Sequence, residues 1–345
     1  MALDLGLLMF SFALTAVLIV PFINLLYKLR FTRRVEAPKK GEVPLFDKMH
    51  DKKAGTPVGG GIIIVASVSI LFAIVYPLVS YLGVYMYAAF DVTSEIQIIF
   101  FTFLSFALLG FYDDFVKLFG KMEQGKLGMW VGLRRKHKFA LQWILAFTIA
   151  LLIYKNLNIS IIHIPIFETV VNLGFWYVPL AAFTIVSFVN AVNITDGLDG
   201  LAAGVLLICL FAFWIIASKV FDTPLSIFIS LWIGALIAFL YFNIWPARIF
   251  MGDSGAMSFG ATLAVIGLLT GKILALVIIG GIFVVEIMSS LTQILSRRYL
   301  GMPILPMAPI HLWLQKAGWE EPKIVMRTWL AGIILAILGL WLAVI

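Results

Sequence analysis

Charge is scarce in this sequence. Only 12% of the 345 residues are Asp, Glu, Lys or Arg, 62% are hydrophobic, and the mean hydropathy is +1.07. A soluble domain of this length needs far more polar surface, so the composition excludes one. The single cysteine, Cys209, excludes a disulfide framework and a cysteine metal site. Alternating ten-residue segments are also absent, which excludes a transmembrane barrel.

The hydrophobic residues occur in runs of roughly 18–25, the length of a helix that crosses a bilayer. We therefore predict an all-α polytopic membrane protein, with residues 1–345 forming one domain, because backbone in lipid must satisfy its hydrogen bonds internally. The first run lacks a preceding basic region and a small-residue cleavage site, so we predict a retained helix and not a signal peptide. The ten predicted spans are about 5–28, 57–83, 96–119, 137–154, 172–192, 198–219, 223–243, 254–271, 273–296 and 325–345.

Lys and Arg are distributed unequally between the two sets of connections. All but three of the 25 (Lys155, Lys219 and Lys272 are the exceptions) fall in or beside the odd-to-even connections. By the positive-inside rule these connections are cytoplasmic and both termini lie outside. The predicted cytoplasmic loops are about 29–56, 117–137, 193–197, 244–253 and 297–324.

The segment 158–171 differs from the spans. It alternates Ile with polar or small residues at strand period and is too short to cross a membrane, which predicts a small periplasmic hairpin. His163 lies there, and we expect it to be structural.

The formal net charge of +7 is a poor argument for nucleic-acid binding in a membrane protein, and we predict no such partner. Topology and attraction to anionic lipid account for it. An electropositive cytoplasmic face that draws in a phosphorylated substrate is also compatible with it.

Five aspartates lie at the ends of hydrophobic runs, and the predicted topology places all of them on one side of the membrane. Carboxylates near hydrocarbon need an ion pair, a bound cation or a wet cavity. The oxygen-rich sequence NITDGLDG is typical of a Mg²⁺ site that approaches substrate phosphate, although an ordinary capped turn has the same residues. The five are Asp113 and Asp114 in GFYDDF, Asp196 and Asp199 in NITDGLDG, and Asp253 in MGDSG.

Two of these groups have additional features. Asp253 begins a predicted helix that Ser254 can cap, and alone it would be an ordinary Asp-Gly turn. Asp113 and Asp114 precede the last turn of their helix, with Lys117 one turn further on. They are either a solvated helix end held by a salt bridge, or a base beside a lysine that neutralises phosphate charge.

Polar residues in two connections and one span complete the candidates. HDKKAGTPVGGG, residues 50–61, offers Lys53 for phosphate or nucleotide contact, or simply as topology charge, and it is not a Walker A loop. The long proline-rich loop after the ninth span carries His311, which alone is more often structural. Glu286 is most simply a buried partner for helix packing, and Gln293 could reach the cavity.

Five motifs occur in a fixed order between about residues 50 and 330: KKAGTP, GF-x-DD-x-x-K, NAVNITDGLDGLA, N-x-x-PA-x-x-FMGD-x-G and PMAPIH…GW-x-EPK. In content and order they resemble the phospho-N-acetylmuramoyl-pentapeptide transferase family. The resemblance implies Mg²⁺-dependent transfer of phospho-MurNAc-pentapeptide from UDP-MurNAc-pentapeptide to undecaprenyl phosphate, giving lipid I and UMP. It also implies a homodimer in the bacterial inner membrane with its active site facing the cytoplasm.

The resemblance assigns roles to matching positions. Asp113 is the candidate base that deprotonates the lipid phosphate, Asp114 is its catalytic neighbour, and Lys117 steadies phosphate charge. Asp253 matches the Mg²⁺ ligand, and Asn193 is a second candidate ligand. The remaining matches are Asn193, Asp196 and Asp199 for the nucleoside and diphosphate, Lys53, Leu198, Asn243 and Phe250 for the uridine pocket, and Gln293, Ala308 and His311 for the specificity loop, His311 being also a catalytic candidate.

The sequence departs from the family pattern at two places. Leu312 and Trp313 follow His311 where the family has two more histidines, and Val58 replaces a hydroxyl residue. These departures leave open a transferase with a UDP-N-acetylhexosamine donor. A cation-coupled transporter is a more distant alternative. Its carboxylates would lie near the bilayer midplane, whereas these aspartates lie at the ends of the predicted spans. Direct attack and a two-step path through an aspartyl phosphate both fit the residues.

Overall fold

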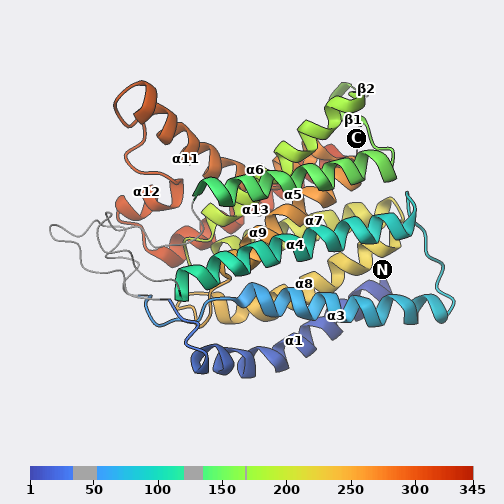
Figure 1. Ribbon diagram of the computed structural model, residues 1–345, viewed down its shortest axis with the longest axis horizontal. Helices are drawn as coiled ribbons and strands as arrows, with labels where there is room; N and C mark the ends of the chain where they lie inside the picture. Colours follow the sequence, from blue (N-terminus) through green and yellow to red (C-terminus); the bar gives the residue numbers. More distant parts are fainter. Residues whose placement is uncertain (34–52, 120–134, 168, 345) are drawn as a thin grey trace.

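The computed structural model describes residues 1–33, 53–119, 135–167 and 169–344, and it is almost entirely helical (Figure 1). In this part of the chain nine helices are long and apolar enough to cross a membrane, which confirms the multi-pass all-α prediction. The predicted loops 29–56 and 117–137 lie largely outside the described residues. The nine helices are α1 (Ala2–Lys28), α3 (Gly60–Tyr81), α4 (Val92–Phe119), α5 (Arg135–Asn156), α6 (Tyr177–Thr195), α7 (Leu201–Lys219), α8 (Thr223–Asn243), α9 (Gly252–Leu269) and α13 (Glu321–Val344).

The predicted ninth span, 273–296, is wrong as a single continuous helix. α10 (Ile273–Ile279) and α11 (Gly281–Tyr299) meet at an angle of 79°, so they make a tenth span only as a bent pair. At the junction, a Cβ on Gly280 would lie 2.6 Å from the Phe188 ring of α6. The apolar run is long enough to span, but two adjacent glycines permit the bend and the close approach of α6.

The predicted hairpin is present. β1 (Ile161–Ile164) and β2 (Thr169–Asn172) pair antiparallel, with Ile161 opposite Asn172. A 3₁₀ turn (Pro165–Phe167) lies between them, and a second (Gly174–Trp176) leads into α6. The hairpin and both chain termini lie at the same end of the bundle (Figure 1).

The helices α8 and α9 form the centre of the bundle. In the most apolar 18-residue segment of each helix, 78% of α8 and 89% of α9 is buried inside the protein, compared with 33% of α1 and 28% of α13. α9 packs against α4 and α6, while α8 packs against α1 and α7. A helix that is apolar on all sides is expected at such a position. This packing brings the end of α4, the end of α6 and the beginning of α9 together.

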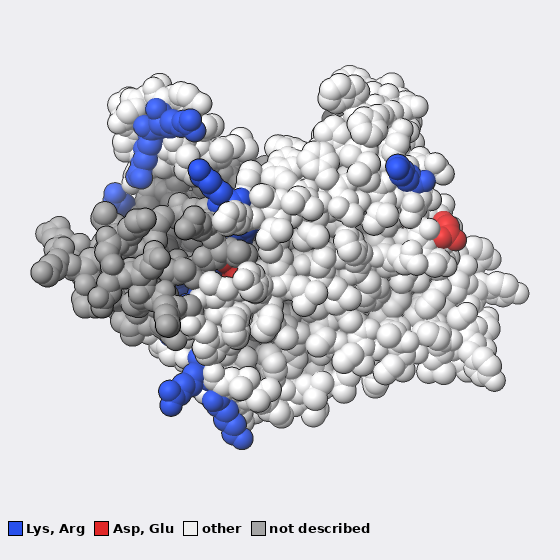
Figure 2. Space-filling model, viewed as in Figure 1, with Lys and Arg blue, Asp and Glu red and all other residues white. Residues whose placement is uncertain are grey.

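Basic side chains gather at the end of the bundle opposite the hairpin. On the face in Figure 2, most of the described Lys and Arg side chains lie at that end, and a wide uncharged surface separates them from the charged side chains at the hairpin end. The uncharged middle has the character of a lipid-facing surface. The short helix α12 (Ile310–Lys316) also lies at the basic end (Figure 1).

Candidate active site

The first turn of α9 is held against the end of α4. A Cβ on Gly110 would lie 2.1 Å from the backbone oxygen of Asp253, so only glycine permits this approach. Asp114 accepts the backbone N–H of Asp253 at 3.1 Å and that of Ser254 at 3.0 Å. The expectation that Ser254 caps this helix is wrong, because its buried Oγ has no hydrogen-bond partner among the described residues. The Asp114 carboxylate satisfies the helix N-terminus instead.

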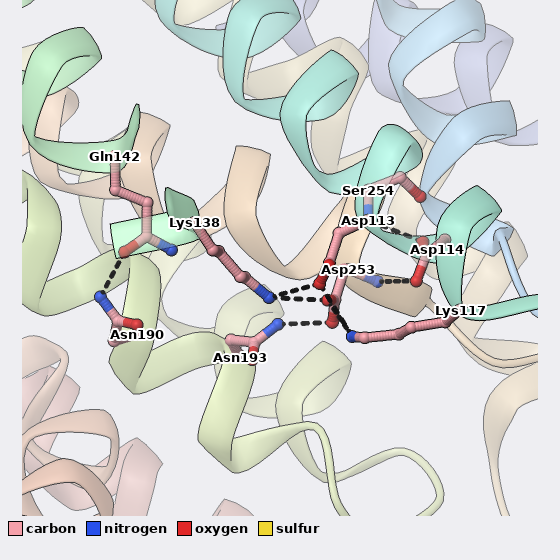
Figure 3. Close-up of polar contacts among 9 residues, drawn as sticks. All are labelled: Asp113, Asp114, Lys117, Lys138, Gln142, Asn190, Asn193, Asp253 and Ser254. Atoms are coloured by element: carbon pink, nitrogen blue, oxygen red, sulfur yellow. Dashed lines mark hydrogen bonds and ion pairs between the residues drawn. The ribbon is translucent and has the colours of Figure 1, made fainter. Parts of the chain in front are cut away.

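Two lysines converge on two aspartates at this junction (Figure 3). The Lys138 ammonium lies 2.8 Å from Oδ2 of Asp113 and 2.7 Å from Oδ2 of Asp253. Lys117 lies 2.9 Å from the same Asp113 oxygen and also donates to Asp253. By sequence Lys117 could pair with either Asp113 or Asp114, and the structure pairs it with Asp113, four residues before it. Two ammonium groups next to two carboxylates suit the binding of phosphate oxygens.

The end of α6 adds amide groups to this cluster. Asn193 donates from Nδ2 to Oδ1 of Asp253 at 2.8 Å, and Asn190 donates to Gln142 of α5 at 2.9 Å (Figure 3). The Asn190–Gln142 bond ties α6 to α5 one turn from Lys138, so it fixes the helix that carries that lysine. Asn193 is therefore in direct contact with the carboxylate that the sequence analysis paired with it as a metal ligand.

A cavity of about 360 Å³ opens beside the cluster. Ten of the fourteen residues that the sequence analysis proposed for the site line this cavity. The predicted site residues therefore lie close together in the fold. Asp113 contacts the wall through Lys117, whereas Gln293, Ala308 and His311 do not line the cavity. The lining residues are Arg33, Lys53, Val58, Asp114, Lys117, Leu118, Asn193, Asp196, Gly197, Leu198, Asp199, Asn243, Phe250, Gly252 and Asp253.

The cavity has a second polar group of residues, formed by Lys53 and Asp199, besides the first, formed by the lysines and Asp113 and Asp253. Lys53 lies 2.5 Å from Oδ1 of Asp199 and 2.5 Å from Oε1 of Glu321, and its ammonium is 6.0 Å from the centroid of the Phe250 ring. Asn243 donates to the backbone oxygen of Ile249 and so holds the loop that precedes α9. An aromatic face beside fixed donors and acceptors is suited to a planar heterocycle.

Asp196 lies in the wall of the cavity. Burial, and next the negative charge of Asp253, raise the pKa of Asp196 to about 7, while Lys53 and Arg33 act in the opposite direction. Because Asp196 follows the last residue of α6, it lies outside the spanning helix. This carboxyl is therefore poised to change its charge near neutral pH.

The first turn of α12 and the loop before it lie next to one wall of the cavity. His311 is 2% exposed, and its Nδ1 lies 3.0 Å from Oε2 of Glu286 in α11. A Cβ on Gly197 would lie 2.6 Å from Nε2 of His311, so the imidazole touches the turn that carries Asp196. Gln293 exchanges two hydrogen bonds with the backbone of Leu305, at 2.8 and 3.0 Å, and so holds the loop.

Known proteins are similar in sequence to almost the whole chain. The model for glycosyl transferase family 4 matches residues 96–271. A phospho-N-acetylmuramoyl-pentapeptide-transferase of Clostridium botulinum is 36% identical over 96% of this chain and 94% of its own length. Those of Geobacillus sp. and Bacillus subtilis are each 34% identical, over 97% and 95% of this chain and 96% and 93% of their own lengths.

The chain belongs to the phospho-N-acetylmuramoyl-pentapeptide transferase family. The family resemblance seen in the sequence is thereby confirmed.

Sequence reasoning missed the roles of two residues in this family member. Lys138 was counted only as a topology charge, although it touches both Asp113 and Asp253. Glu321 was given no role of its own, although it contacts Lys53 and lies outside the segment 96–271 that the glycosyl transferase model matches. The expectation that Glu286 is a buried partner in helix packing is confirmed, because it is bonded to His311 of α12.

Proposed function

We propose that this protein transfers phospho-MurNAc-pentapeptide from UDP-MurNAc-pentapeptide to undecaprenyl phosphate, releasing UMP and forming lipid I. The observation that carries the proposal is the cluster of lysines and aspartates at one end of a cavity. Asp253, Lys117 and Asn193 line the cavity, and Asp113 and Lys138 are bonded to them. Full-length similarity to transferases of that name supports the same conclusion.

The two polar groups of the cavity suggest how the donor lies. The lysines at Asp113 and Asp253 favour the diphosphate, since ammonium groups neutralise phosphate charge. Phe250, Lys53 and Asp199 favour the nucleoside, with the ring offering a stacking surface. We propose that the sugar-peptide extends toward Ala308 and the beginning of α12, which carries His311.

The donor set at Asp253 fits Mg²⁺. Within the described ranges no three His, Cys, Asp or Glu side chains cluster so as to hold a metal by themselves. Mg²⁺ does not need such a cage, because it commonly uses one or two carboxylates with waters and substrate phosphates. Asp253, on which two ammonium groups converge, and Asn193 would hold the ion. When bound, Mg²⁺ would neutralise charge on the diphosphate.

In the proposed reaction an oxygen of the lipid phosphate attacks the sugar-linked phosphorus of the donor. A new P–O bond forms, the bond from that phosphorus to the bridging oxygen breaks, and the electron pair leaves with UMP. Asp113 is proposed to accept the proton when the acceptor phosphate arrives protonated. Lys117 and Lys138 would stabilise charge on the phosphoryl oxygens, and Asp114 would position Asp253 through its backbone.

We also propose the orientation and assembly of the protein. The basic residues at the cavity end support a cytoplasmic active site and external termini in the inner membrane of a bacterium (Figure 2). A cytoplasmic site gives the soluble nucleotide access, while the acceptor's tail remains in lipid. We propose a homodimer from the family resemblance.

A donor assay tests the proposal. Purified protein in detergent is incubated with Mg²⁺, undecaprenyl phosphate and either UDP-MurNAc-pentapeptide or UDP-N-acetylglucosamine, and UMP and the lipid product are quantified. We expect UMP and lipid I only with the muramyl donor, and background levels from Asp253→Asn. UMP release with UDP-N-acetylglucosamine alone would support the hexosamine alternative, to which Leu312 and Trp313 point. Vesicle uptake without UMP would support a transporter.

A further inference from the structure

Glu321 connects the last helix to the nucleoside end of the cavity. It is the first residue of α13, and its Oε1 lies 2.5 Å from Nζ of Lys53 and accepts the backbone N–H of Asp199 at 2.6 Å. A carboxylate at a helix N-terminus is favoured by the helix dipole. One oxygen of Glu321 thus restrains two groups that line the cavity and come from two other segments of the chain.

The restraint on Asp199 is complete. Its Oδ1 accepts from Lys53 at 2.5 Å, its Oδ2 accepts from the backbone N–H of Ala247 at 2.9 Å, and its own N–H is bound to Glu321. Four segments therefore meet at this residue: the loop before α3, the turn between α6 and α7, the loop before α9, and α13. A side chain so fully bonded is held in a single orientation.

Trp329 gives α13 a second contact with the same turn. It lies eight residues after Glu321, which places it on the same helix face two turns away. Its Nε1 donates to the backbone oxygen of Gly200 at 3.2 Å. A Cβ on Gly204 would lie 2.1 Å from the indole, so the ring is seated directly on α7. α13 thus contacts the turn on both sides of the peptide that joins Asp199 to Gly200.

The charges explain why Lys53 needs a second carboxylate. Its side chain is 16% exposed, and those of Asp199 and Glu321 are 4% and 11% exposed. At this depth screening by solvent is weak, so a single flexible ammonium would be drawn toward Asp196, Asp253 or an incoming phosphate. Two carboxylates, each 2.5 Å from the ammonium, keep it near Phe250 instead.

We propose that Glu321 is a positioning residue for recognition of the donor nucleobase. It acts through Lys53, whose ammonium it holds near the Phe250 ring, and through the backbone of Asp199 in the wall of the same cavity. This inference rests on the proposed function, since it assumes a nucleotide donor. Because the acceptor phosphate belongs at the other polar group of the cavity, Glu321 affects the donor alone.

Steady-state kinetics with both substrates test the inference. Glu321→Gln keeps the acceptor for the Asp199 N–H and removes the charge opposite Lys53. We expect the donor KM to rise about tenfold, while kcat and the KM for undecaprenyl phosphate stay within about twofold. Glu321→Asp restores the charge on a shorter side chain and should recover part of the loss. The matched control is Glu320→Gln, because the adjacent Glu320 is exposed.

A double-mutant cycle with Lys53→Met separates positioning from stability. If Glu321 acts through Lys53, adding Glu321→Gln to Lys53→Met raises the donor KM by less than about twofold. If the rise in donor KM in the double variant equalled the product of the rises in the two single variants, the inference would be overturned. An unchanged donor KM in Glu321→Gln would also overturn it. An equal loss in both KM values and kcat would also overturn it. Failure of both Glu321 variants to fold would do the same, since it assigns the residue to stability.

The inference can fail separately from the proposed function. If the wild-type protein releases no UMP from UDP-MurNAc-pentapeptide, the proposed function fails. If the wild type is active and Glu321→Gln behaves as Glu320→Gln does, only the role of Glu321 fails.

Discussion

Asp114 accepts the backbone N–H of Asp253 at 3.1 Å, so the carboxylate of one helix fixes the backbone of the carboxylate that begins another. The second oxygen of Asp114 accepts the N–H of Ser254 at 3.0 Å. Asp114 is 4% exposed, and both of its carboxylate oxygens accept N–H groups at the N-terminus of α9. Its neighbour Asp113 is turned toward Lys117 and Lys138. Two adjacent aspartates thus do different work because they point in different directions from α4.

Replacing Asp114 by Asn should destabilise the protein as well as inactivate it. An amide presents one acceptor where two N–H groups now bond, and its NH₂ group would face a donor. We expect a loss of about 1–3 kcal/mol, seen as a lower thermal midpoint in detergent. Asp91→Asn, at an exposed residue, is the control. An unchanged midpoint would show that Asp114 does not hold α9.

The sequence predicted most of this site because its chemistry is local. NITDGLDG and MGDSG each place carboxylates and glycines at the end of an apolar run, and such runs reveal membrane helices through their length alone. The hairpin around His163 was likewise visible as a short alternating segment. A common membrane face then brought the motifs together.

The sequence could not predict contacts that depend on packing between distant helices. Lys136 and Lys138 are equivalent in a basic run, and only the placement of α5 beside α4 and α6 directs Lys138 to Asp253. Glu321 contacts Lys53 across 268 positions in the chain. Each lies in a quoted motif, KKAGTP or GW-x-EPK, but no local pattern shows that the two motifs meet. The bend at Gly280 was missed because hydropathy measures length and not direction.

Lys138 should be essential for turnover. Lys138→Gln removes one of the two ammonium groups at Asp113 and Asp253, and the loss of one preorganised donor commonly lowers kcat by about 100-fold or more. UMP release under saturating substrate measures this effect. Lys136→Gln removes the same charge two residues away at an exposed position and should leave kcat nearly unchanged. Equal activity in the two variants would remove Lys138 from the proposed mechanism.

The Glu286–His311 pair should stabilise the loop next to the cavity. Both side chains are buried and 3.0 Å apart, so Glu286→Ala leaves Nδ1 of His311 without its partner. We expect a cost of about 1–3 kcal/mol and easier proteolysis of the loop before α12.

The double variant Glu286→Ala with His311→Phe tests whether the cost arises from the pair. It removes both polar partners and should be more stable than Glu286→Ala alone. If the double variant loses the sum of the two single losses, the two residues are not coupled.

Stability should fall as Asp196 ionises. The pKa of this carboxyl is raised from 3.8 to about 7 in the folded protein, chiefly by burial, so folding favours its protonated form. The stabilisation is complete below about pH 4, declines as the pH rises, and is lost above about pH 7. Asp196→Asn cannot ionise, so its thermal midpoint relative to the wild type should rise between pH 4 and 7 and then level off. Asp91→Asn should show no such trend, because the pKa of Asp91 is lowered by its hydrogen bonds to Ser94. If the difference in thermal midpoint between Asp196→Asn and the wild type stayed constant from pH 4 to 7, the pKa of Asp196 would not be raised in the folded protein.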